Sequence, residues 1–175
     1  MGGHRPPLQK TTGKLIMDVF TQIEQTGFAT WVRQSPSILG YPSFLFLHTV
    51  GLGLLVGASV TIDLRILGFG RRTALAPMEK LYPLIALGFW ISFVSGVVLW
   101  TIDAATWSKS IVFYIKIAFI VAGMLTLRLI RSRVLKDPAA NGGVVPVNGK
   151  ILAIVSLVVW LGAITAGRLT AYIGK

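Results

Sequence analysis

The distribution of apolar residues along the chain predicts four membrane-spanning helices. Four apolar runs contain few charged residues, and each is close to the roughly 20 residues needed to cross the hydrocarbon layer of a bilayer. Their predicted bounds are Phe44 to Leu67, Tyr82 to Ile102, Ser110 to Ile130 and Ile151 to Ile173. The sequence therefore predicts an all-α, polytopic membrane protein in which residues 44–175 form a four-helix bundle.

A different pattern precedes these runs, from Leu15 to Val32. Apolar side chains recur there at helical spacing, and polar ones such as Asp18 lie on the opposite face. Such a helix is typical of a segment that lies in the membrane interface. A linker with two prolines follows, and Ser43 is in position to cap the first spanning helix. We expect residues 1–43 to form an N-terminal tail with one amphipathic interfacial helix.

Composition excludes an ordinary soluble domain and several kinds of site. Hydrophobic residues make up 54% of the 175 positions and charged residues only 13%, with a mean hydropathy of +0.73. The net charge of +11 comes mainly from Lys and Arg at the ends of apolar runs, which indicates lipid headgroups as partners and no nucleic acid. The chain has no cysteine, which excludes disulfides, thiolate metal sites and iron–sulfur clusters.

Loop charges predict the orientation in the membrane. Basic residues flank the first and third loops between the spanning helices: Arg65, Arg71, Arg72 and Lys80, then Arg131, Arg133, Lys136 and Lys150. Loops rich in Lys and Arg face the cytoplasm. The second loop offers only Lys109 beside Asp103, and the C-terminal tail only Lys175, although the N-terminal tail is also basic. We predict a multi-pass protein of the inner membrane with both termini outside the cytoplasm.

Small residues spaced four apart mark a possible packing face on each spanning helix. Such residues let membrane helices approach closely, because lipid provides no hydrophobic drive for their association. They indicate packing within the bundle, within a homo-oligomer or within a larger membrane complex. The predicted packing residues are Gly53 and Gly57; Gly88, Ser92 and Gly96; Ala118 and Ala122; and Gly162 and Ala166.

Polar residues form a stripe along the first spanning helix. At about 100° per residue, His48, Ser59 and Asp63 fall on one narrow arc, and Gly57 points nearly the opposite way. Ionisable residues inside a membrane are costly and often functional. Arg128 of the third spanning helix lies at a depth similar to that of Asp63, so we predict a structural ion pair between them at the cytoplasmic edge.

His48 is the candidate ligand for a cofactor. A neutral imidazole can bind haem iron, and Arg168 or Lys116, at similar depth, could hold the propionates of a haem b. Each residue also has an alternative role without haem. His48 could be a buried histidine that hydrogen-bonds a neighbouring helix, and Lys116 could extend its ammonium group toward the membrane surface. The only other histidine is His4 in the tail. A haem would therefore be five-coordinate or shared between two chains.

A set of residues between Tyr41 and Tyr172 forms a pattern known from other chains: His48, Gly51, Gly57, Asp63, Leu64, Arg65, Gly68 and the run Ala166, Gly167 and Arg168. On these residues, the stretch resembles an uncharacterised family of bacterial four-helix integral membrane proteins. More distantly, it is similar to the membrane domains of copper-resistance D proteins and of small cytochromes b, which use membrane histidines. The resemblance implies the fold and the topology and supplies no activity.

Three functional hypotheses follow from these patterns. The chain contains no Ser/His/Asp constellation, no paired carboxylates in one site and no phosphate-binding loop, so we assign no catalytic or metal-binding residues. The leading hypothesis is a non-enzymatic membrane protein that acts as a packing or assembly subunit. One alternative is an electron-transfer subunit that binds haem b or a metal through His48. The other is a small transporter, although no proline interrupts a spanning helix and no inverted repeat is visible.

Overall fold

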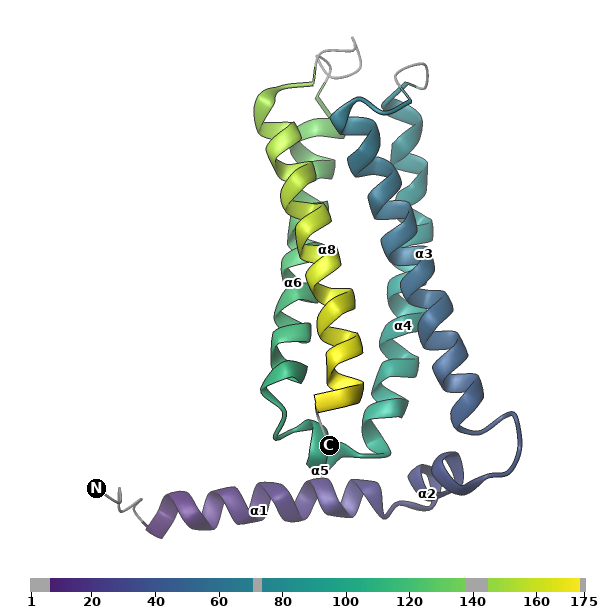
Figure 1. The fold of residues 1–175 in the computed structure, drawn as a ribbon, viewed down its shortest axis with the longest axis vertical. Helices are drawn as coiled ribbons and strands as arrows, with labels where there is room; N and C mark the ends of the chain where they lie inside the picture. The colour runs from purple at the N-terminus through teal and green to yellow at the C-terminus, as the bar shows by residue number, and fades with distance from the viewer. Residues whose placement is uncertain (1–6, 71–73, 138–144, 174–175) are drawn as a thin grey trace.

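The computed structural model describes residues 7–70, 74–137 and 145–173, and these form helices joined by short connections (Figure 1). Four helices are long and apolar enough to cross a membrane, so the protein is an all-α, multi-pass bundle. In chain order the elements are α1 Pro7–Glu24, α2 Gly27–Gln34, α3 Tyr41–Leu67, the 3₁₀ helix η1 Ala76–Leu81, α4 Tyr82–Thr101, α5 Ala104–Trp107, α6 Ile111–Ile130, the π-helix η2 Arg131–Leu135 and α8 Val147–Ile173.

The spanning helices begin and end within four residues of the predicted bounds. The prediction of Ser43 as the cap of α3 was wrong, because Gly40 occupies that position and α3 starts at Tyr41. Pro42 lies in the first turn, where its missing N–H leaves no donor unpaired. The Ser43 hydroxyl instead donates a hydrogen bond to the Ile38 carbonyl oxygen at 2.6 Å.

The single amphipathic helix predicted from Leu15 to Val32 is two helices, α1 and α2. The break lies at Thr26, whose hydroxyl oxygen accepts a hydrogen bond from the Ala29 amide at 3.3 Å and so caps α2. Gly27 follows the cap as the first residue of α2. The spacing of apolar residues continues through this break, which is why periodicity alone did not locate it.

The N-terminal helix α1 lies across one end of the bundle, beneath the connection between α4 and α6 (Figure 1). The Ala105 amide of α5 donates a hydrogen bond to Glu24 Oε1 at 2.6 Å. The Phe20 ring meets the Trp100 ring edge to face, with 5.7 Å between centroids. These contacts hold α1 on the same end of the bundle as the last turn of α8.

The bundle consists of two helix pairs, α3 with α4 and α6 with α8, which are joined by contacts between α3 and α8. The first pair is closest at Gly51 and Gly88. A Cβ on Gly51 would lie 2.5 Å from the Ser92 backbone nitrogen, and one on Gly88 would lie 2.6 Å from the Leu55 nitrogen. Backbone therefore meets backbone at this crossing, which only glycine permits.

Large side chains fill the glycine positions of the second pair. A Cβ on Gly123 of α6 would lie 2.8 Å from the Trp160 ring, and one on Gly162 of α8 would lie 2.7 Å from the Phe119 ring. Ala166 is buried as well. The predicted packing roles of Gly162 and Ala166 agree with this arrangement.

Other predicted packing residues lie elsewhere. Gly53 and Gly57 are exposed, and a Cβ on either would meet nothing within 4 Å. Ala118 is also exposed and Ala122 is half-buried, because α6 turns Gly123 toward α8 instead. Within the described chain, Gly53, Gly57 and Ala118 therefore do not pack within the bundle, and the alternative that they pack against a second copy or a larger complex stays a prediction.

At the opposite end from α1, side chains link α4, η1 and α6. The Tyr82 hydroxyl donates a hydrogen bond to the Leu127 carbonyl oxygen at 2.9 Å. The Arg131 guanidinium binds Glu79 Oε1 at 3.0 Å and lies over the Tyr82 ring, 4.8 Å from its centroid. These polar contacts tie the start of α4 to the end of α6.

Candidate functional site

The polar stripe of α3 lies on a buried face of the helix. Leu55, Ser59 and Asp63 are buried, and His48 is half-buried. The Ser59 hydroxyl donates to the Leu55 carbonyl oxygen of its own helix at 2.6 Å. The two ionisable residues, His48 and Asp63, are 15 positions apart, which places them roughly 22 Å apart along the helix axis. They therefore form separate candidate sites, one toward each end of α3.

His48 contacts the backbone of α4. Its Nδ1 lies 2.8 Å from the Ser92 carbonyl oxygen, 3.3 Å from the Ser92 hydroxyl and 3.4 Å from the Ser95 hydroxyl. A Cβ on Gly96 would lie 2.9 Å from the imidazole Cε1, so any larger residue at this position would clash with the His48 ring. The predicted packing residues Ser92 and Gly96 thus form the surface on which His48 rests.

This contact assigns the proton on the imidazole. A carbonyl oxygen can only accept a hydrogen bond, so Nδ1 carries the hydrogen when the ring is neutral. Nε2 then has the free lone pair, which is the arrangement found in many metal-binding histidines. Nε2 is therefore the ring atom of His48 that could accept a hydrogen bond or bind a metal.

Lys116 and Arg168 differ in their relation to His48. Lys116 is half-buried, and its Nζ would lie 4.0 Å from a Cβ on Gly167 of α8. Its ammonium group is within electrostatic range of the His48 ring. Arg168 is exposed on the same helix as Gly167. The structure thus turns Lys116, but not Arg168, toward the interior that His48 occupies, and it does not support Arg168 as a propionate partner in the same chain.

The predicted ion pair between Asp63 and Arg128 is absent. Asp63 is completely buried, and neither of its carboxyl oxygens has a hydrogen-bond partner. Arg128 is exposed and lines a basic surface pocket of about 470 Å³ with Arg131, Ser132 and Lys136. Leu127, the residue before Arg128, is buried against the core, and one step along a helix turns a side chain by about 100°. Equal depth was therefore insufficient to predict contact.

Two buried polar residues of α8, Ser156 and Trp160, were not among the predicted site residues. Ser156 lies beside the Asp63 carboxyl, although its hydroxyl forms no hydrogen bond. Trp160, four residues later, is 1% exposed, and its Nε1 also has no partner. A serine and a tryptophan at helical spacing within an apolar run could have signalled a second polar face.

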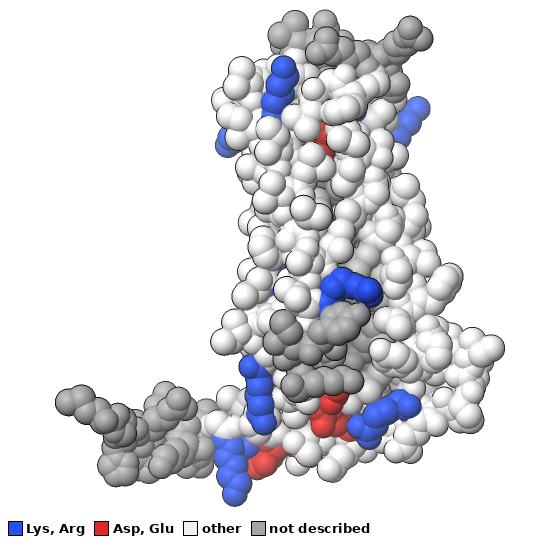
Figure 2. All heavy atoms as spheres, in the orientation of Figure 1, with Lys and Arg blue, Asp and Glu red and all other residues white. Residues whose placement is uncertain are grey.

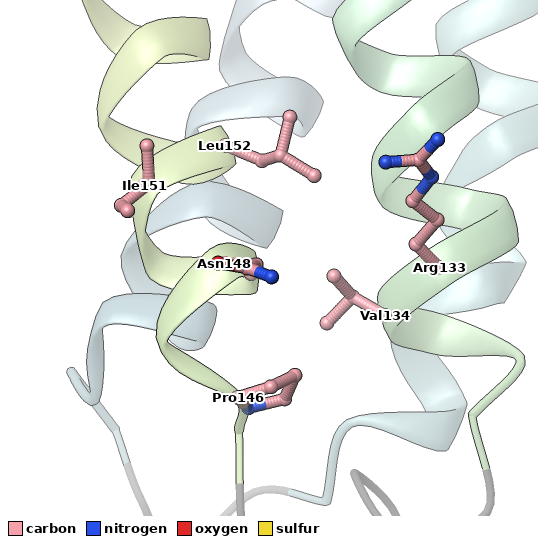
Figure 3. A pocket seen from close by; sticks show the side chains of 7 residues that line it. Arg133, Val134, Pro146, Asn148, Ile151 and Leu152 are labelled. Carbon is pink, nitrogen blue, oxygen red and sulfur yellow. The ribbon is translucent and has the colours of Figure 1, made fainter.

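A cavity of about 370 Å³ lies at the end of the bundle opposite α1, between η2 and α8. Figure 3 shows Asn148 of α8 directed toward Val134 of η2, with Arg133 on the η2 side. None of the predicted site residues lines this cavity. The residues that do are Arg133, Val134, Pro146, Asn148, Gly149, Ile151 and Leu152.

Charge is distributed as expected for a protein that crosses a membrane. Figure 2 shows Lys and Arg side chains near both ends of the bundle and a largely uncharged wall between them. Many large apolar side chains of the spanning helices are exposed on this wall, among them Phe46, Trp90 and Val158. Lipid is the solvent that accommodates such a surface.

Comparison of the chain with protein-family models, with curated proteins and with solved structures finds no match. The resemblance to bacterial four-helix membrane proteins therefore stays a prediction. Function has to be argued from the arrangement of the side chains themselves.

Proposed function

We propose that the protein is a non-enzymatic subunit of a membrane assembly, in which α3 packs against α3 of a second copy. The observation that carries this proposal is the open face formed by Gly53 and Gly57. Both glycines are exposed, with nothing within 4 Å of the position of a Cβ. Elsewhere in the same bundle, Gly51 and Gly88 are in close contact with another helix.

The contrast between these two sets of glycines supports association. In a lipid-facing position, glycine leaves a shallow groove and gains none of the dispersion attraction that a larger side chain would. Two glycines four apart allow the backbone of a partner helix to fill that groove. In a symmetric dimer the groove of each copy is filled by α3 of the other, because the same patch faces itself across a two-fold axis.

Disulfide cross-linking can test this contact without background, because the chain has no cysteine. Gly57→Cys in native membranes should form a covalent dimer on mild oxidation. Val94→Cys, at an exposed position on α4, is the matched control and should remain monomeric. Absence of a dimer at both Gly53→Cys and Gly57→Cys, or equal dimer formation at Val94→Cys, would reject the proposed interface.

We further propose that the assembly lies in a bacterial inner membrane, with the end that carries η1 and η2 facing the cytoplasm. Basic residues at this end include Lys80, Arg131 and Arg133, and such residues favour the cytoplasmic side. A reporter active only in the cytoplasm should work when fused after Lys136 and fail after Lys175. The reverse result would invert the orientation.

A second candidate function is haem binding through His48, and the contact of Nδ1 with the Ser92 carbonyl favours it. Haem b would supply reversible one-electron chemistry. This chain offers one suitable imidazole, so a second axial ligand would have to come from another copy. His48 would bind the iron through Nε2, and Lys116 is the nearer of the two predicted propionate partners.

An absorption spectrum of the purified protein separates the two functions. Haem binding predicts a Soret band that His48→Ala abolishes and that the exposed Arg168→Ala leaves unchanged. One haem for every two chains would indicate a site shared by two copies. A colourless protein purified from cells supplied with haem would exclude this second candidate.

A further inference from the structure

Buried polar atoms without partners occur on α3 and α8, and two of the residues that carry them, Asp63 and Ser156, are neighbours. Both carboxyl oxygens of Asp63 lack a hydrogen bond, as do the Ser156 hydroxyl and the Trp160 Nε1. Asp63 and Ser156 are 0% exposed and Trp160 is 1% exposed. Most buried polar groups in proteins are paired, so several unpaired groups on two facing helices require an explanation.

The burial of Asp63 without partners favours the protonated form of its carboxyl group. An isolated carboxylate in a medium of low dielectric constant is strongly unfavourable, and such groups become neutral instead. A protonated carboxyl group can also donate a hydrogen bond, whereas a carboxylate can only accept one. The dry arrangement seen here therefore suits the protonated form.

Among the described residues, no charged group forms an ion pair or a hydrogen bond with Asp63. Arg65, two residues further along α3, is half-buried and has its own interaction, but it does not hydrogen-bond the Asp63 oxygens. From α4, the nearest ionisable group is the Tyr82 phenol, which is neutral at ordinary pH.

No described cation of the other helices reaches Asp63, since Arg128 of α6 lies at a similar depth but is exposed. The sequence of α8 contains no ionisable residue between Lys150 and Arg168, and that of α6 contains none between Lys116 and Arg128. In η1, Glu79 is bound to Arg131, and the neighbouring Lys80 is exposed. Among the described residues there is also no group of three or more His, Cys, Asp or Glu that could hold a metal ion. A proton is therefore the ligand that this site fits best.

We propose that Asp63 is a proton-binding site within the membrane, and that the contact between α3 and α8 described here is its protonated, dry state. Asp63 is four residues before the end of α3 at Leu67, about 6 Å along the axis. Water entering from this end would accept the proton. The O–H bond breaks, its electron pair stays on the carboxylate, and the water between α3 and α8 solvates the new charge.

Infrared difference spectroscopy of the protein in lipid bilayers, recorded as a function of pH, tests this proposal directly. A protonated carboxyl group has a C=O stretching band above the amide region, and the band disappears when the proton is released. We expect one such band to titrate reversibly in the wild type and to be absent in Asp63→Asn. Asp18→Asn, at an exposed carboxyl group in α1, should leave the band unchanged.

Every outcome of this experiment decides the proposal. A band that persists over the whole pH range in which the protein stays folded means a permanently neutral structural group, and it overturns the proposal. Absence of any band from the wild type means an ionised carboxylate and overturns it as well. If Asp63→Asn does not fold, Asp63→Glu should shift the frequency of the titrating band, and an unshifted band would belong to another residue. The test does not depend on whether α3 forms a dimer.

Discussion

Gly88→Ala would add a methyl group at the point where α3 and α4 are closest. The new Cβ would lie 2.6 Å from the Leu55 backbone nitrogen and 2.8 Å from the Gly51 carbonyl oxygen. Ordinary contacts begin near 3.4 Å, so the two backbones would have to separate by about 0.8 Å. A gap of that size forfeits roughly a quarter to a half of the attraction between facing atoms. We expect the free energy of unfolding to fall by about 1–3 kcal/mol, a typical effect of overpacking.

Gly57→Ala is the matched control on α3. The same methyl group would meet no atom of the chain within 4 Å, and alanine favours a helix over glycine by up to about 1 kcal/mol. The stability of the monomer should therefore be unchanged or slightly higher. If α3 forms the proposed dimer, the larger Gly57→Leu should weaken association and leave the monomer folded.

Reversible unfolding in mixed micelles, followed by circular dichroism, measures both variants against the wild type. Each variant adds one methyl group to a glycine of a spanning helix, so the two variants differ only in what surrounds the added group. Equal stabilities for Gly88→Ala and Gly57→Ala would refute the close approach of the two backbones. A larger loss at Gly57 in the monomeric protein would mean that α3 is rotated relative to the structure described here.

Three further changes test contacts at the two ends of the bundle. Tyr82→Phe removes the hydrogen bond to the Leu127 carbonyl oxygen and should lower stability by about 1 kcal/mol in the same unfolding assay. Arg131→Gln removes a partly exposed ion pair and should lower it by less than about 1 kcal/mol, an effect that added salt diminishes. Glu24→Ala leaves the Ala105 amide without its acceptor, and faster hydrogen exchange of α1 should report its release from the bundle.

The spanning helices were predictable because a membrane imposes their length and apolar character directly on the sequence. The rotation of each helix about its axis was harder to predict. On α3, Gly51 and Gly53 are two positions apart and point in different directions, and each belongs to a plausible small face. Only the position of α4 selects Gly51. Spacing alone could not have distinguished the internal contact from the lipid-facing groove.

The candidate site was predictable only where it depends on spacing within a single helix. The burial of Ser59 and Asp63 on one stripe could be predicted from spacing within a single helix. The partner of Asp63 depends on two helices far apart in sequence, so the prediction of Arg128 relied on depth and failed. Its actual neighbour, Ser156, carries no charge, and therefore offered no signal to a search for ion pairs.

The contact between α1 and α5 also has a consequence for the order of assembly during synthesis. The hydrogen bond from the Ala105 amide to Glu24 joins residues 81 positions apart. Ribosomes add roughly 5–20 residues per second, so α5 is completed roughly 4–16 s after α1. During that interval α5 does not yet exist for α1 to dock on, and of the elements that contact α1 only α2 is made soon after it. The helix made before the four spans is thus among the last to reach its final contacts.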